Sequence, residues 1–326
     1  MRRLLASLAA VMALALCFVA SAQADPLLLY TSQPDEDIRI LLEAFKKDFP
    51  DVAVRVFRSG TEEVVSKVLA EKMTGRVQAD LLLLADAVTF ELLKTEGILA
   101  PYPSPEAAAL PDSVRDPDGF YCGTKVLATV LLYNTAAKAV EPTWKALLAS
   151  ENADKAIIAS PLYSGAAAYQ LGVLTRSDGF GWDFYSAMKA NAVAVGKGNG
   201  SIITAVAGGE RAFGPVVDYM ARRAKAKGSP VDYVYPVEGS PIITEPVGLV
   251  AREEIRDDAK RFVDFLLSEK GQTLFSEMGY VPVRHGVPVP DGLQGIEQVT
   301  ILNADATVLA GERERDKARF SELFGH

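Results

Sequence analysis

Three short stretches place a glycine beside hydroxyl or amide side chains, just before segments with helical patterning. They are Ser59-Gly60-Thr61, Ser164-Gly165-Ala166 and Asn199-Gly200-Ser201. The N-terminus of a helix presents backbone N–H groups without an intrahelical acceptor and carries a partial positive charge. Glycine lets an oxyanion approach that backbone, and a Ser or Thr hydroxyl adds a donor. The chemistry available to these stretches is therefore the binding of an oxyanion.

Each stretch taken alone also has a simpler explanation, because Ser and Thr are preferred N-cap residues of ordinary helices. For any single stretch a plain cap is sufficient, whereas three in one chain favour a shared ligand. Ser32, which follows the first predicted strand, completes the set of hydroxyl candidates.

Catalytic motifs are poorly represented. The histidines are His285, in a Pro-rich stretch, and the terminal His326, and the sequence has no HExxH, GxSxG or paired CxxC motif. The Gly-rich segment 196–200 contains Lys197 without a Walker pattern, which indicates a solvated turn. We predict a protein that is not an enzyme and needs no cofactor. A secreted enzyme acting on a phosphorylated metabolite is the alternative from another class.

The elements that must position these residues alternate along the chain. Apolar or β-branched runs at 27–30, 52–57 and 79–84 predict strands, and helical patterning separates them. This β-α-β-α-β order implies a mainly parallel sheet with helices on its faces. The alternation returns after a long predicted strand at 125–133, and residues 257–278 predict one amphipathic helix.

The first 24 residues have the three parts of a secretory signal peptide. Arg2 and Arg3 precede an uncharged apolar run, and small residues at 20–24 form an A-x-A type cleavage site. The run is short for a membrane anchor and ends in small residues. We therefore predict a mature periplasmic protein.

Composition restricts the partners. The chain has 34 basic and 42 acidic residues for a net charge of −8, and loss of Arg2 and Arg3 makes this about −10. A nucleic-acid surface would be basic, so no nucleic-acid partner is expected. Cys122 is the only cysteine left in the mature chain, so it is expected to be a small buried hydrophobe without a disulfide.

Four segments resemble the ferric-iron-type periplasmic binding proteins. They read LLLYTSQPDEDIRILLEAFKKDFPDVAVRVFRSGTEEVVSKVLAEK, QADLLLLADAVTFELLKTEGILAPYPSP, SPLYSGAAAYQLGVL and AKRFVDFLLSEKGQTLFSEMGYVPV. That family includes receptors for ferric iron, for aminoalkyl phosphonates and for phosphorylated small molecules. The resemblance implies an α/β, two-lobed type II periplasmic-binding fold with a ligand cleft between the lobes. It also implies a monomeric receptor that delivers its ligand to the membrane permease of an ABC importer.

The resemblance allows iron to be tested against the residues. Members that bind bare ferric ion have a His near the first strand, a Glu after the third strand and an adjacent Tyr pair. At the matching positions this sequence has Pro34 for the His, Asp86 for the Glu and Asp218-Tyr219 for the Tyr pair. Carboxylate and phenolate oxygens suit a hard cation, but the His is absent. We predict no metal, with ferric ion held by Asp86, Asp218 and Tyr219 as the alternative.

The same residues have other interpretations. Together with Glu245 they could contact amino or hydroxyl groups of an organic ligand, while Asp86 could instead be a helix cap before Thr89 and Tyr219 a core aromatic. In the iron-binding members the segment matching Ser164-Gly165-Ala166 holds a phosphate-like anion. The resemblance therefore makes this segment the leading candidate for anion binding. The predicted ligand is a phosphonate or phosphorylated organic solute, captured by hinged closure. Lobe one is predicted at 25–125 plus 240–285, and lobe two at 126–239 plus 286–326.

Overall fold

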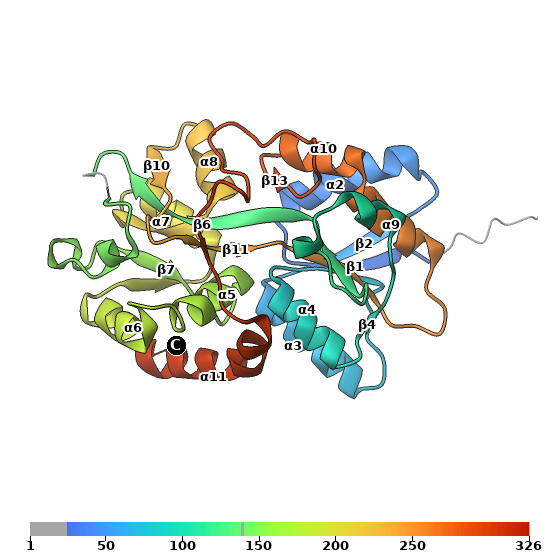
Figure 1. Ribbon diagram of the computed structural model, residues 1–326, viewed down its shortest axis with the longest axis horizontal. Coiled ribbons are helices and arrows are strands. Elements are labelled where there is room, and N and C mark those ends of the chain that lie inside the picture. The colour runs from blue at the N-terminus through green and yellow to red at the C-terminus, as the bar shows by residue number, and fades with distance from the viewer. Residues whose placement is uncertain (1–24, 138–139, 326) are drawn as a thin grey trace, which may run out of the picture.

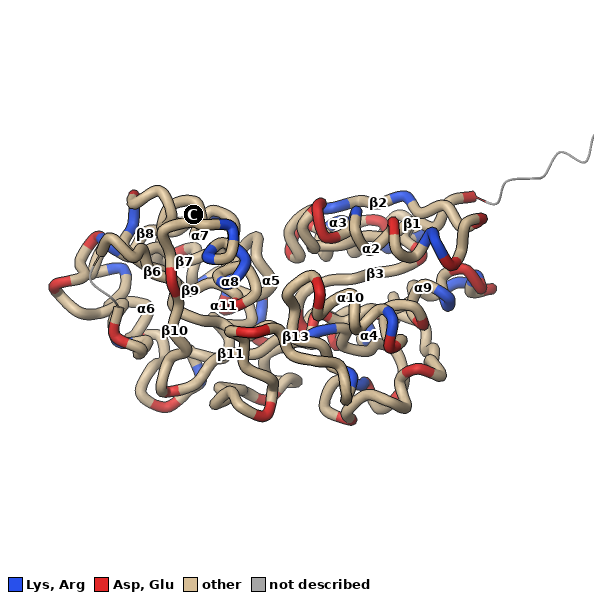
Figure 2. Tube along the Cα trace, turned by 90° about the horizontal axis from the view of Figure 1, so that it is seen from above, with Lys and Arg blue, Asp and Glu red and all other residues tan. Residues whose placement is uncertain are grey.

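The computed structural model describes residues 25–137 and 140–325, and the predicted signal peptide lies outside them. Two six-stranded sheets occupy two bodies that lie side by side along the long axis (Figure 1 and Figure 2). This is the predicted two-lobed α/β architecture. Among the described residues, no helix is both long and apolar enough to cross a membrane.

The first sheet has the order β2-β1-β3-β12-β4, and β5 also pairs with β12. Its strands are β1 (Leu27–Thr31), β2 (Val54–Arg58), β3 (Leu81–Leu83), β4 (Leu99–Ala100), β5 (Tyr121–Gly123) and β12 (Pro246–Val250). The first three are parallel, and β12 returns antiparallel between β3 and β4. Helices α2 (Asp35–Asp48), α3 (Thr61–Met73) and α4 (Ala87–Thr95) connect or follow the parallel strands. The predicted β-α-β-α-β order is confirmed.

The second sheet is built around one long strand, β6 (Lys125–Asn134), which runs from one lobe into the other in Figure 1. It pairs antiparallel with β9, β10, β11 and β13, and β11 pairs with β14. These partners are β9 (Phe213–Val217), β10 (Val231–Val234), β11 (Ser240–Ile243), β13 (Val281–Pro282) and β14 (Ile301–Leu302). A separate parallel pair joins β7 (Ile157–Ala159) to β8 (Ala194–Gly196).

The remaining helices cover the two sheets. They are α5 (Gly165–Leu174), α6 (Gly181–Ala190), α7 (Asn199–Ala207), α8 (Asp218–Ala226), α9 (Asp257–Leu267), α10 (Glu269–Glu277) and α11 (Ala306–Phe324), with short 3-10 turns at Pro105–Ala109, Asp112–Val114, Trp144–Leu147 and Ser150–Asn152.

The single helix predicted over 257–278 is two helices. Ser268 ends α9 with extended backbone and caps α10, because its hydroxyl accepts a hydrogen bond from the Gly271 N–H at 3.1 Å. A Cβ at Gly271 would lie 2.0 Å from the carbonyl oxygen of Phe265. The chain can turn this tightly only because residue 271 has no side chain.

The chain crosses between the lobes after β5, again after β11, and a third time between α10 and β14. The predicted return to lobe one begins at residue 240, but Ser240–Ile243 pair with β6 and β14 in the second sheet. The second crossing therefore comes between Ile243 and Pro246. The polar residues Thr244 and Glu245, followed by Pro246, interrupt the apolar run between β11 and β12 and mark this boundary in the sequence.

Candidate ligand-binding site

A cavity of about 470 Å³ lies where the two lobes meet. Both lobes line it. Lobe one contributes Ser32, Pro34, Arg58, Gly60, Thr61 and Ala85, and lobe two contributes Tyr163–Ala166, Lys197–Ser201, Val217, Tyr219 and Met220. The crossing strands and the turn between them contribute Leu127, Ile243 and Glu245. On the side of lobe one, the lining follows the carboxyl ends of β1, β2 and β3. Ligand sites of parallel α/β sheets form at this edge.

Three helices begin at the cavity. The N-caps are Gly60 for α3, Ser164 for α5 and Gly198 for α7. Their first N–H groups have no acceptor within their own helices, and the helix dipoles place partial positive charge at the same ends. The fold therefore brings the three stretches singled out in the sequence to one cavity, although Ser59 itself is not among its lining residues.

The serine hydroxyls are not equivalent. The Ser164 hydroxyl oxygen accepts from the Ala167 N–H at 3.3 Å, which leaves its own hydrogen free to donate. The Ser201 hydroxyl accepts from the Gly198 N–H at 3.2 Å and donates to the Gly198 carbonyl at 2.7 Å, so it holds the loop. The Ser32 hydroxyl accepts from the Ala85 N–H at 3.3 Å. Ser164 is thus both a cap and an available donor.

The charge of the cavity is positive. Its one lining carboxylate, Glu245, forms an ion pair of 2.6 Å with the fully buried ammonium group of Lys125. The lining cations are Arg58 and Lys197, and the Lys197 ammonium lies 4.2 Å above the ring of Tyr163. Lys125 neutralises Glu245, and Lys197 lies 3.8 Å from a carboxylate oxygen of Glu63, so among the described residues Arg58 is the lining cation without an acidic partner.

Asp86 lies outside this cavity. It is completely buried as the N-cap of α4, where its carboxylate accepts from the Thr89 N–H at 2.7 Å and pairs with Arg313 at 2.9 Å. The cap interpretation describes its position, and its charge is already compensated.

Asp218 is also buried away from the cavity lining, whereas its neighbour Tyr219 lines it. The Asp218 carboxylate accepts from the Tyr219 N–H at 2.8 Å and from the Tyr235 hydroxyl at 3.2 Å. Burial raises the pKa of Asp218 to about 7. Burial, together with the charge of Glu245, raises the pKa of the Tyr219 phenol above its ordinary value.

The three ferric candidates are therefore not gathered around one point. In residues 25–137 and 140–325, no group of three or more His, Cys, Asp or Glu side chains could hold a metal ion.

Comparison with known proteins identifies the chain. The sequence pattern of the bacterial extracellular solute-binding protein family matches residues 78–305, which is more than half of the chain. The protein belongs to this family. The cavity between its lobes is accordingly the candidate solute site.

Individual relatives are distant in sequence but similar in fold. The probable ABC transporter periplasmic-binding protein y4fP of Sinorhizobium fredii is 26% identical over 273 residues, covering 80% of this chain and 75% of the relative. The structure of AfuA from Actinobacillus pleuropneumoniae, with fructose-6-phosphate bound, superposes with a TM-score of 0.83 at 19% identity, covering 92% and 98% of the two chains. Iron-bound HitA from Pseudomonas aeruginosa superposes with a TM-score of 0.79 at 20% identity, covering 90% of this chain and 99% of HitA. These likenesses establish the two-lobed fold.

The sequence candidates for this solute-binding protein did not include several lining residues, among them Arg58, Tyr163 and Lys197. Arg58 ends a strand and Tyr163 directly precedes Ser164, so adjacency to a candidate stretch was the available signal. Lys197 was interpreted as a solvated turn. It is largely exposed, but it also lies one residue before the N-cap of α7 and lines the cavity.

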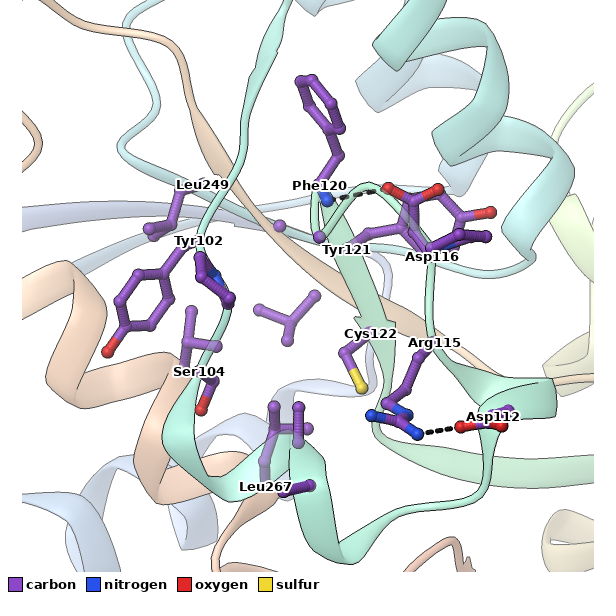
Figure 3. A pocket seen from close by; sticks show the side chains of 18 residues that line it. Tyr102, Ser104, Asp112, Arg115, Asp116, Phe120, Tyr121, Cys122, Leu249 and Leu267 are labelled. Atoms are coloured by element: carbon purple, nitrogen blue, oxygen red, sulfur yellow. Dashed lines mark hydrogen bonds and ion pairs between the residues drawn. The ribbon is translucent and has the colours of Figure 1, made fainter.

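A second cavity, of about 600 Å³, lies within lobe one (Figure 3). Many of its polar groups already have partners, since Tyr102 and Ser104 donate to Asp264 and Arg115 pairs with Asp112. Cys122 lines it as a buried thiol whose pKa burial raises to about 12, which disfavours the reactive thiolate. Its lining comes from lobe one alone, whereas both lobes line the inter-lobe cavity, which is therefore the candidate site.

The buried Asp218 makes a pH-dependent contribution to stability that can be measured. Its pKa of about 7 in the folded protein exceeds the unfolded value of 3.8, so the folded state binds the proton more tightly. The stability contributed by Asp218 is therefore present at low pH and lost as pH rises towards 7 and above. Asp218→Asn cannot ionise and does not lose this contribution. The unfolding free energy of Asp218→Asn, relative to that of the wild type, should therefore be about 2–3 kcal/mol higher at pH 8 than at pH 5.

Urea unfolding at both pH values measures this gain, with the exposed Asp51→Asn as the matched control. A constant difference between wild type and Asp218→Asn across this range would contradict the raised pKa.

Proposed function

We propose that this protein is the periplasmic receptor of an ABC importer, that it acts as a monomer, and that its ligand is an organic solute carrying a phosphoryl or phosphonyl group. The observation that carries the proposal is the convergence of three helix N-termini and two cations on a cavity whose one carboxylate is neutralised. Backbone N–H groups at helix starts are effective ligands for phosphate-like anions.

The size of the cavity supports an organic solute. Pockets for small organic molecules have volumes of about 300–1,000 Å³, and this one has about 470 Å³. Tyr163 offers an aromatic face beside the anion-binding groups, suited to the body of such a molecule. AfuA, a structural neighbour with fructose-6-phosphate bound, is consistent with a ligand of this class.

Ferric ion is the second candidate, because HitA is iron-bound and Tyr219 lines the cavity. A phenolate ligand must lose its proton, and the raised pKa of Tyr219 opposes this. Asp86 and Asp218 are engaged elsewhere, so iron would have Tyr219 and Glu245 as its protein ligands, and Glu245 is paired with Lys125.

Two substitutions separate the candidates. A hydrogen bond to a charged oxygen contributes about 1.5–3 kcal/mol, so Ser164→Ala should weaken binding of the cognate phosphonate or sugar phosphate about 10- to 100-fold. Tyr219→Phe should have a smaller effect. Calorimetric titration with a panel of phosphonates, sugar phosphates and ferric citrate measures both, and the exposed Ser186→Ala is the matched control.

Mass spectrometry after prolonged incubation should recover the ligand unchanged, whereas a converted product would indicate an enzyme. A coloured ferric complex that Tyr219→Phe abolishes would overturn the proposal in favour of iron.

A further inference from the structure

The C-terminal helix α11 belongs to lobe two. Asp316 forms two hydrogen bonds with the guanidinium group of Arg176, at 2.6 and 3.2 Å. Leu309 packs on Gly172 of α5, and Phe320 lies in the hydrophobic core of lobe two. These contacts anchor α11 to α5 and α6, beside which it lies in Figure 1. Leu309 also packs against Val88 of α4 in lobe one, but the ion pair of Asp316 and the core contact of Phe320 hold the helix to lobe two, and we expect it to move with that lobe.

The same helix reaches across to lobe one. Arg313 donates to Glu62 at 2.6 Å and to Asp86 at 2.9 Å, and Lys317 donates to Glu62 at 2.6 Å. The side chains of Arg313, Glu62 and Asp86 are 6%, 5% and 0% exposed. This inter-lobe cluster thus joins two cations of lobe two to two carboxylates of lobe one, shielded from water.

The cluster lies directly behind the wall of the ligand cavity. Glu62 is in the first turn of α3, next to Gly60 and Thr61, which line the cavity. Its own N–H donates across the lobes to the Tyr163 carbonyl at 3.4 Å. Although burial raises the pKa of the Glu62 carboxyl, the charges of Arg313 and Lys317 hold it below its ordinary value. The carboxylate is therefore charged while the lobes are together.

We propose that Arg313 and Lys317 act as a latch that stabilises the closed arrangement of the lobes without touching the ligand. The latch rests on the proposed capture by closure, and it adds a determinant of affinity outside the ligand cavity. Rotation of lobe two away from lobe one breaks all three ion pairs together. A ligand that binds the closed form gains whatever free energy the latch contributes to that form.

The test uses the full-length mature protein with spin labels on Met73→Cys in α3 and Ser186→Cys in α6. Both positions are exposed and lie on opposite lobes, and the buried Cys122 does not compete for the label. Distance distributions are recorded without ligand for the wild type, for Arg313→Met and for Arg315→Met. Arg315 is the matched control because its ion pair with Glu312 stays within α11.

The expected result is a shift of the Arg313→Met distribution to longer distances, with Arg315→Met unchanged. For the phosphonate or sugar phosphate that the titration panel identifies, affinity should fall about 5- to 150-fold in Arg313→Met, the usual range of coupling between sites. If Arg313→Met does not fold, Lys317→Met removes one partner of Glu62 from a more exposed position and should cause the same shift, smaller in size.

Unchanged distances in both Arg313→Met and Lys317→Met would overturn the latch. If the distances are unchanged but the melting temperature falls, the cluster stabilises the fold without controlling closure, which also overturns the latch. The distances are measured without ligand. A panel in which no compound binds the wild type would therefore reject the proposed function and still leave the latch tested.

Discussion

Gly60→Ala should weaken ligand binding by about 3 kcal/mol, or roughly 150-fold. Gly60 has φ −63°, which alanine adopts readily. An added Cβ would lie 2.5 Å from the Tyr163 carbonyl oxygen and 2.6 Å from Cε2 of its ring. Tyr163 belongs to the opposite lobe, so the clash exists only when the lobes meet.

Gly200→Ala is the matched control for Gly60→Ala. Gly200 also lines the cavity, at the start of α7, but a Cβ there meets nothing within 4 Å. Calorimetry measures the affinities, and the inter-lobe distance at saturating ligand shows whether Gly60→Ala stays open. Wild-type affinity in Gly60→Ala would show that the contact between Gly60 and Tyr163 is not needed for capture.

Lys125→Met should destabilise the protein by about 3–5 kcal/mol, because it leaves the buried carboxylate of Glu245 without its cation. Lys125 is fully buried, donates to Glu245 at 2.6 Å, and lies 4.6 Å from the ring centroid of Phe275. The substitution should also weaken binding of an anionic ligand, since Glu245 lines the cavity and its charge would no longer be neutralised.

The double variant Lys125→Met, Glu245→Gln removes both charges and should recover most of the stability and of the ligand affinity. Urea unfolding and calorimetry measure the two effects, with the exposed Lys46→Met as control. If Lys125→Met is as stable as Lys46→Met, the ion pair does not hold the crossing strands together. If the double variant binds no better than Lys125→Met, the carboxylate is not the cause of the loss of affinity.

Local features of the sequence determined the secondary structure and the helix starts that form the site. Alternating apolar runs set the order β1-α2-β2-α3-β3, and residues 59–61, 164–166 and 199–201 marked the starts of α3, α5 and α7. These signals act within one turn of chain, because a cap residue bonds to N–H groups two or three positions away. They could therefore be recognised without knowledge of distant contacts.

Only the tertiary structure decided which charged residues line the inter-lobe cavity. Asp86 and Asp218 resemble candidate ligands in sequence, yet one pairs with Arg313, which is 227 residues distant, and the other bonds to Tyr235 in the interior. Glu245 stays at the cavity with its charge neutralised by Lys125, and Lys197 joins the lining from what looked like a solvated turn. The energy of a charge depends on its burial and its partners, and both are set where two lobes meet rather than by neighbours along the chain.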